Sequence, residues 1–386
     1  DELTDADANT AIGTGALGTD RKGNKSVAVG FGSLFTQDFA TSTDALNVAV
    51  GYNAGTAITT GTLNTLVGGN TGDAITTGFD NVAIGRSALT TEDTGRKNVA
   101  IGSSALENQN SDSDNFNTAV GFEAGKAVTT GVQNTIMGAN AGDALNTGSF
   151  NVAVGHVALT TDTKGNKSTA IGYGALYAQN LTTSTDTYNV AVGYDAGGAI
   201  TTGLANTLVG GFAGKALTTG ADNVAMGYGA LTTDDVGSRS IAIGSGALEA
   251  QNFATATNSY NTSVGHHAGN DVTTGVQNTL IGALAGDSLT DADHNTAVGF
   301  NALTADTQGS KSVAIGTGTL ATQNFTTATN AYNVAIGYDA GVAVTTATEN
   351  TLIGGLAGDA LTTGFSNVAV GVNSLGTETT GRKNVA

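Results

Sequence analysis

The stretch Asn47-Val48-Ala49-Val50-Gly51 sets the organisation of this chain, because it returns along the whole length. Over 386 residues the sequence holds 21 full copies of this pentad, and a 22nd is cut off at Ala386. Position one is Asn or Ser, position four is Val, Ile or Met, and position five is always Gly. No full copy carries a charged residue. Such regular self-similarity is typical of repeat architectures, in which each unit packs mainly on its neighbours.

The spacing of the pentads reveals a second, longer repeat. Most pentad glycines are 17 residues apart, and every fourth interval is lengthened to 19 or 21 residues, which makes a super-repeat of 70 to 72 residues. We therefore interpret residues 1–386 as a single continuous array without domain boundaries. Its super-repeats are approximately 47–116, 117–188, 189–260 and 261–332, with partial repeats at 1–46 and 333–386. Because the array begins and stops inside repeats, we expect it to be an excerpt of a longer fibre.

Each pentad is predicted to form a short β-strand. Alternation places positions two and four on one face, with Val or Thr and then Val, Ile or Met, and positions one, three and five on the other. Neither face is charged, so we expect both to be covered, one by the interior of the coil and one by something else. The pattern leaves open which face is interior. Turn glycines such as Gly61 follow a second half-coil, which we predict to hold a second short strand.

These patterns predict an all-β fold, a parallel β-solenoid or β-roll of about 22 coils of 17–21 residues with a four-coil super-repeat. Stacking would align the asparagines as a ladder in which each amide bonds the next. The structural repeat residues of three consecutive coils are Asn47, Val50, Gly51, Asn64, Val67, Gly68, Asn81, Ile84 and Gly85.

Composition argues against several classes of function. The net charge of −18 disfavours nucleic acid as a partner, and no apolar run is long enough for direct membrane insertion of this segment. The four histidines do not recur at one repeat position, and Cys is absent. We predict no enzyme activity, no catalytic residue, no cofactor and no metal site. Carboxylates such as Asp73 and the charged turn 92–97 are interpreted as exposed surface charge, with calcium or anionic glycan binding as the respective alternatives.

The pentad copies Ser312-Val313-Ala314-Ile315-Gly316 and Asn98-Val99-Ala100-Ile101-Gly102 resemble the head repeat of trimeric autotransporter adhesins of the YadA type. The pattern in residues 295–303 is also similar to repeats in bacteriophage tail fibres. The adhesin resemblance implies a β-roll in which three chains pack about one axis as a homotrimeric rod, and a role in binding host or matrix surfaces. It assigns no binding residue to this chain.

We therefore expect a non-enzymatic extracellular fibre segment, on a cell surface or virion, that serves attachment or acts as a spacer shaft. The alternative is the shaft of a bacteriophage or phage-like tail fibre for host recognition, and a minor alternative is an ice-binding solenoid with aligned Thr-Thr ranks. Expected partners are further copies of the chain and host or surface glycans or proteins. Aromatic side chains of the lengthened fourth coils either fill that larger coil or contact a partner. They are Phe39, Phe116, Tyr188, Phe253, Tyr260, Phe325 and Tyr332.

Overall fold

The chain is a parallel β-solenoid of about 21 coils, seen in a computed structural model that describes residues 6–386. No helix occurs among these residues, so the predicted all-β parallel solenoid is confirmed. The 22nd, truncated pentad contributes only an isolated bridge between Val385 and Val368. Residues 1–5 of the predicted partial repeat 1–46 lie outside the described residues. The chain divides into two units, Asp1–Asn189 and Val190–Ala386, and each is described by itself.

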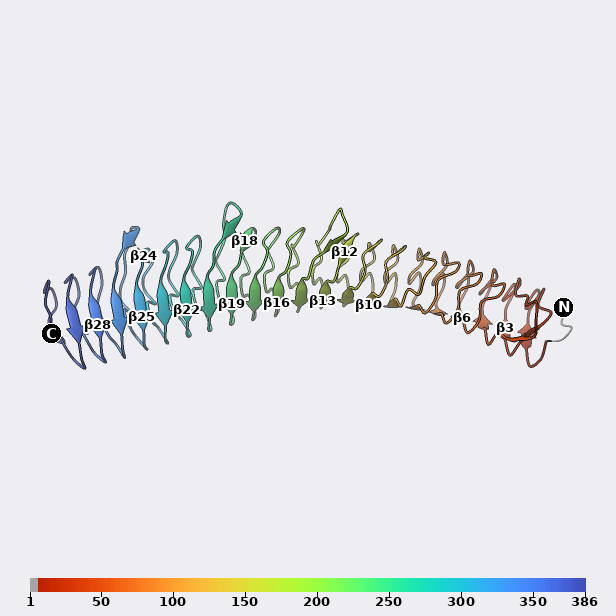
Figure 1. Ribbon diagram of the computed structural model, residues 1–386, viewed down its shortest axis with the longest axis horizontal. Coiled ribbons are helices and arrows are strands. Elements are labelled where there is room, and N and C mark those ends of the chain that lie inside the picture. The colour runs from red at the N-terminus through yellow and green to blue at the C-terminus, as the bar shows by residue number, and fades with distance from the viewer. Residues whose placement is uncertain (1–5) are drawn as a thin grey trace. The chain divides into compact units, whose positions relative to one another are not determined.

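Every full pentad forms a three-residue strand at its central positions (Figure 1). In the first unit these strands are β1 (Thr10–Ile12), β3 (Val27–Val29), β5 (Val48–Val50), β6 (Thr65–Val67), β7 (Val82–Ile84), β8 (Val99–Ile101), β9 (Thr118–Val120), β10 (Thr135–Met137), β11 (Val152–Val154) and β13 (Thr169–Ile171). In the second unit they are β15 (Val190–Val192), β16 (Thr207–Val209), β17 (Val224–Met226), β19 (Ile241–Ile243), β21 (Thr262–Val264), β22 (Thr279–Ile281), β23 (Thr296–Val298), β25 (Val313–Ile315), β27 (Val334–Ile336), β28 (Thr351–Ile353) and β29 (Val368–Val370).

Strands of successive coils pair in parallel with no slip in register. Ala49 of β5 pairs with Leu66 of β6, and Leu66 pairs with Ala83 of β7. The lengthened coils keep the same register, since Ala28 pairs with Ala49 across a 21-residue step. The extra residues are therefore accommodated away from the strands, and the ladder inside each unit stays regular.

The inserted residues form their own small ladders. Four pairs of two-residue strands lie in parallel, on the side of the coil away from the pentad strands (Figure 1). They are β2 (Gly23–Asn24) with β4 (Thr43–Asp44), β12 (Gly165–Asn166) with β14 (Thr185–Asp186), β18 (Gly237–Ser238) with β20 (Thr257–Asn258), and β24 (Gly309–Ser310) with β26 (Thr329–Asn330).

The prediction of a second strand in every coil is wrong. In ordinary coils the second half is a run of turns and bends. In the lengthened coils the two-residue strands are the only addition among the described residues. The physical reason is that side chains such as Leu89, with φ of 55°, hold the backbone in the left-handed region and interrupt an extended chain. The cost of that conformation is offset by packing, because Leu89 is fully buried in the stacked coils.

The structure decides which strand face is interior. Asn47 and Ala49, at positions one and three, are fully buried, whereas Val48 and Val50 are only half-buried. The coil interior is completed by Ala54 and by larger side chains such as Ile58 from the turn-rich half. The narrow coil therefore holds the small and amide side chains next to the strand, and the branched apolar side chains point outward.

Gly51 shows why the last pentad position is glycine. Its φ is 144°, and a Cβ atom there would overlap the carbonyl oxygen of Gly68 in the next coil. Only glycine allows the backbones of stacked coils to approach this closely at the end of the strand.

Candidate binding surfaces

The asparagines at position one form a buried polar ladder. The Nδ2 atom of Asn64 donates to the carbonyl oxygen of Gly78 at 2.9 Å, and its Oδ1 atom accepts the backbone N–H of Asn81 at 3.1 Å. Asn47 makes the equivalent bonds to Gly61 and Asn64. These side chains satisfy backbone groups at the turn and the strand of each coil, so they hold the stack together and are closed to partners.

A second buried network recurs once per super-repeat and joins a carboxylate of the third coil to a glutamine of the fourth. In the copy around Asp234, Nε2 of Gln251 donates to Oδ2 of Asp234 at 2.6 Å and to Oγ of Ser240 at 2.8 Å. Oδ1 of Asp234 accepts the N–H of Gly237 at 2.9 Å. Burial raises the pKa of Asp234. The same carboxylate–glutamine pair is made by Asp20 with Gln37, Asp162 with Gln179 and Asp306 with Gln323.

The interpretation of the turn 92–97 as exposed charge needs a correction. Glu92 is fully buried, accepts the N–H of Gly95 at 2.7 Å and bonds Asn115 at 3.0 Å, and burial raises its pKa. The first carboxylate is drawn inside because the tight turn needs an acceptor for its N–H groups. Lys97, at the end of the same turn, bonds Asp114 at the surface, as expected for an exposed pair.

The predicted fourth-coil aromatic residues fall into two groups. Phe39, Phe253 and Phe325 are 5–6% exposed and fill the lengthened coil. Phe116, Tyr188, Tyr260 and Tyr332 are 50–57% exposed, and they are the members of the set that a partner could touch. The sequence alone did not separate the groups, because each loop carries its aromatics in similarly uncharged surroundings.

A basic side chain covers each exposed ring of the second group. The cation lies 5.0 to 5.7 Å from the ring centroid in the pairs Lys97–Phe116, Lys167–Tyr188, Arg239–Tyr260 and Lys311–Tyr332. In the pair at Tyr188, Lys167 also bonds Asp186 at 2.6 Å, and this bond raises the pKa of the lysine and lowers that of the aspartate. These cations already have a carboxylate or an aromatic face as partner, so the row is a poor site for free anions.

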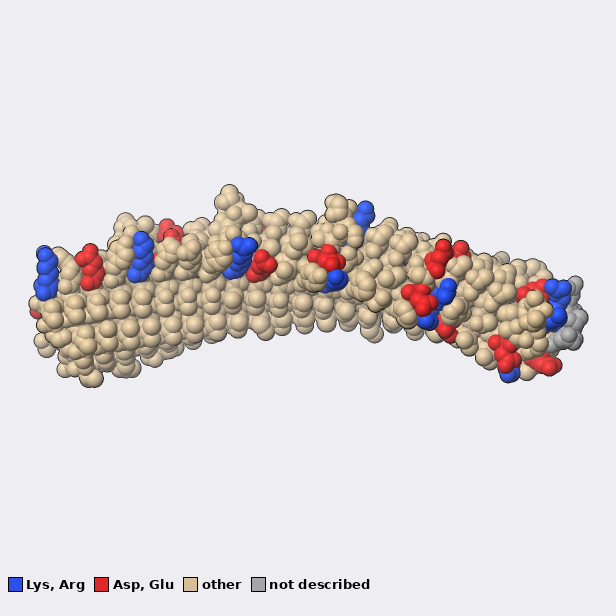
Figure 2. All heavy atoms as spheres, viewed as in Figure 1, with Lys and Arg blue, Asp and Glu red and all other residues tan. Residues whose placement is uncertain are grey.

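The outward face of the pentad strands is an apolar surface without charged residues, which we call the strand face. It consists of positions two and four of the pentads, for example Met226 and Ile281, each 40% exposed. On the side of Val190–Ala386 in view in Figure 2, the charged side chains lie along one edge, and none lies over strands β16 to β28. The clearly exposed large side chains of the face are Ile12, Ile84, Met137, Ile171, Met226, Ile241, Ile281, Ile315, Ile353, Val368 and Val370.

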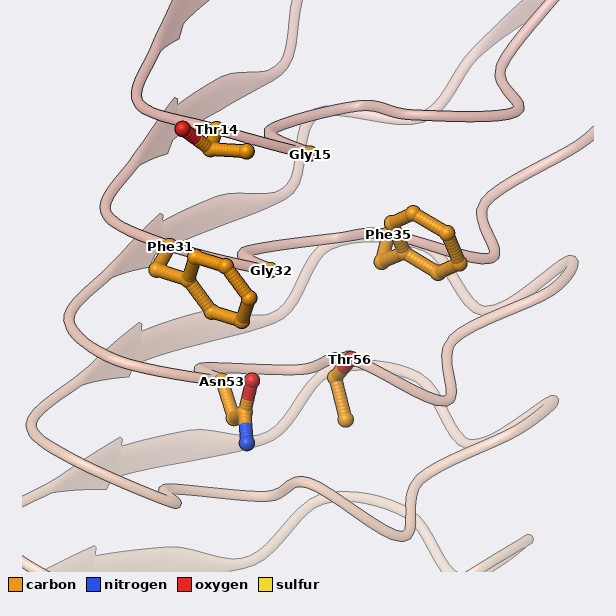
Figure 3. Close-up of a pocket in the computed structure, with 7 residues that line it drawn as sticks. All are labelled: Thr14, Gly15, Phe31, Gly32, Phe35, Asn53 and Thr56. Atoms are coloured by element: carbon orange, nitrogen blue, oxygen red, sulfur yellow. The ribbon is translucent and has the colours of Figure 1, made fainter.

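A third surface, the turn edge, is formed by the residues one, two and five places after each pentad glycine. In the first unit it contains a hollow of about 320 Å³ between Phe31 and Phe35, with Gly15 and Gly32 between the rings (Figure 3). Phe31 stacks on Tyr52 with ring centroids 5.5 Å apart. Sequence reasoning noticed aromatic residues such as Tyr52 after the pentad but gave them no role; their recurrence next to glycine was the available signal.

The second unit has a hollow at the corresponding positions, of about 200 Å³, lined by Phe212, Tyr228 and Thr232 and by two charged residues. The charged residues are Lys215, whose Nζ atom lies 4.8 Å from the centroid of the Phe212 ring, and Glu249. The two hollows therefore share their place in the coil and differ in charge.

Two further searches bear on function. Among residues 6–386 no group of three or more His, Cys, Asp or Glu side chains is arranged to hold a metal ion. Within the same part of the chain no helix has the length and apolar character needed to cross a membrane.

The chain matches no protein-family model, and comparison with curated proteins found no similar sequence.

Proposed function

We propose that this chain is a non-enzymatic segment of an extracellular fibre, in which copies of the chain pack laterally through the strand face. The observation that carries the proposal is that uncharged, half-exposed Val, Thr, Ile and Met side chains follow the strand ladder along each unit. A contiguous apolar surface of this kind is uncommon on a monomer and usually marks an interaction site.

The electrostatics of the chain favour further copies as the occupant of that surface. The net charge is −18, so two chains repel unless their charged sides point away from each other. The strand face is free of charge, and contact there buries apolar side chains without bringing carboxylates together. Closed packing about one axis also leaves no strand face exposed, and the resemblance to trimeric adhesins favours three chains. A laterally packed array of this kind suits attachment or spacing on a cell surface, and equally the shaft of a phage tail fibre.

The solution mass, measured by light scattering, tests this proposal. We expect three times the chain mass of 37.9 kDa. Replacing Met226 and Ile281 together by Lys should shift the mass toward one chain, because both side chains point outward and a buried ammonium is costly. The exposed loop variant Thr255→Lys is the control and should keep the wild-type mass. A wild-type monomer at all concentrations would contradict the proposal.

One observation favours ice binding as a second candidate function. The Thr and Val rows of the strand face stay in register past the lengthened coils, as in Thr262–Thr279–Thr296, so the insertions do not interrupt this surface. A monomer that shows thermal hysteresis, lost in Thr279→Lys, would support ice binding in place of lateral packing. A trimer without thermal hysteresis would exclude it.

A further inference from the structure

We propose that the hollow between Phe31 and Phe35 is a binding site for one ring of a neutral saccharide. The site lies on the turn edge and not on the strand face, so the proposal goes beyond the fibre function and does not rest on it.

The two aromatic side chains provide flat apolar walls. Phe31 is 55% exposed and Phe35 is 43% exposed, although each is a large apolar residue. Both rings are held in place: Phe31 stacks on Tyr52, and a Cβ atom at Gly15 or Gly18 would lie within about 3 Å of the Phe35 ring. Rigid aromatic faces of this kind bind the apolar C–H face of a pyranose ring with little loss of side-chain freedom.

Polar groups converge on the floor between the walls (Figure 3). A Cβ atom on Gly32 would lie 2.6 Å from Oδ1 of Asn53 and 3.8 Å from Oγ1 of Thr56, so both atoms face the same space. Neither side chain has a hydrogen-bond partner among the described residues. The amide offers a donor and an acceptor, and the hydroxyl offers both, as the hydroxyl groups of a sugar require.

Size and charge narrow the class of ligand. The hollow of about 320 Å³ is at the small end of the range for ligand sites. None of the residues that line it is charged, which disfavours a carboxylated, sulfated or phosphorylated ligand. An apolar face combined with uncharged hydroxyl recognition points to a neutral monosaccharide unit, bound alone or within a glycan.

Gly32 keeps the hollow open, and the chain itself suggests how to close it. Its φ is 67°, and the equivalent residues of the next two coils, Asn53 and Asn70, adopt φ of 54°. The backbone of this position therefore accepts asparagine, and Gly32→Asn repeats a pair of stacked asparagines that the chain already contains. This variant should fold and place its side chain where the saccharide would lie.

Saturation-transfer NMR on the purified chain tests the proposal, with glucose, galactose, mannose, N-acetylglucosamine and cellobiose as probes and sialyllactose as the charged comparison. We expect transfer to the ring protons of at least one neutral saccharide. Phe31→Ala and Gly32→Asn should each abolish it. The matched control is Phe300→Ala, at the same repeat position and 51% exposed, but flanked by Leu284 and Asn301 where the hollow has Gly15 and Gly32.

Three results would overturn the proposal: no transfer to any neutral saccharide, transfer to sialyllactose alone, or transfer that survives both Phe31→Ala and Gly32→Asn. Equal loss in Phe300→Ala would show that exposed aromatic residues bind without a hollow and would also overturn it. The light-scattering mass of each variant is recorded alongside. A change in saccharide binding without a change in mass separates this site from the lateral packing of the fibre.

Discussion

Nε2 of Gln251 donates a hydrogen bond to Oδ2 of Asp234 at 2.6 Å, and both side chains are fully buried. Gln251 uses its remaining polar atoms as well, because Nε2 also donates to Ser240 and Oε1 accepts from Asn261. One glutamine therefore links a third-coil turn, its own lengthened coil and the next pentad. Since the arrangement recurs in each super-repeat, it is the device that accommodates a lengthened coil in a regular stack.

Asp234→Ala should lower the free energy of unfolding by about 2 kcal/mol, because it leaves Gln251 Nε2 and the N–H of Gly237 buried with fewer acceptors. Urea denaturation followed by circular dichroism measures the change. The control is Thr255→Ala, an exposed position in the same lengthened coil, which should stay within about 0.5 kcal/mol of wild type. Equal effects of the two variants would mean that the network contributes nothing specific.

The buried carboxylate also makes a prediction about pH. Burial raises the pKa of Asp234 in the folded chain above its ordinary value, so the folded state binds the proton more tightly than the unfolded state. The contribution of this group to stability therefore increases as pH falls through the raised pKa toward the unfolded value. Asp234→Asn cannot titrate. The wild type should gain stability relative to this variant between about pH 7 and pH 3.5 in thermal melts. A relative loss on acidification would refute the assignment.

Asn98→Ser should stabilise the chain. Asn98 stands where the other lengthened coils have Ser, and its buried Nδ2 and Oδ1 atoms have no hydrogen-bond partner. A serine would let Gln109 donate to it as Gln251 donates to Ser240. We expect a gain of about 1 kcal/mol in the free energy of unfolding.

The same change at Asn64 is the matched control for Asn98→Ser. Asn64→Ser should destabilise the chain by a similar amount, since it removes the ladder bonds to Gly78 and Asn81. Thermal melts of both variants measure the contrast. Changes of the same sign in the two variants would disprove the role given to Asn98.

Gly51→Ala should destabilise the chain by about 3 kcal/mol, because the Cβ atom overlaps the backbone of Gly68 and φ lies in the left-handed half of the map. Gly69→Ala is a close control, since a Cβ atom there meets nothing within 4 Å. Denaturation midpoints of the two single variants test this contrast. Similar midpoints would show that coil stacking tolerates a side chain at the end of the strand.

Much of the fold followed from the sequence because the repeat is exact in spacing. A fixed interval between pentads requires parallel stacking in register, and it predicted the aligned strands, with Ala49 opposite Leu66. The invariant pentad glycine indicated a close approach of backbones, which the structure shows at Gly51. These features depend on periodicity alone, so they did not need knowledge of distant contacts.

The tertiary structure decided which residues are inside. Both faces of the pentad are uncharged, so the pattern could not tell Asn47 and Ala49 from Val48 and Val50; closing the coil did, because its narrow interior takes the small and amide side chains. Glu92 is buried for a similar reason, since its acceptor is needed by a turn that the chain forms only when stacked. Phe253 and Tyr260 share one loop, yet one fills the coil and the other is exposed. Sequence determined the period of this protein, and the closing of the coil determined which of its surfaces meet solvent and partners.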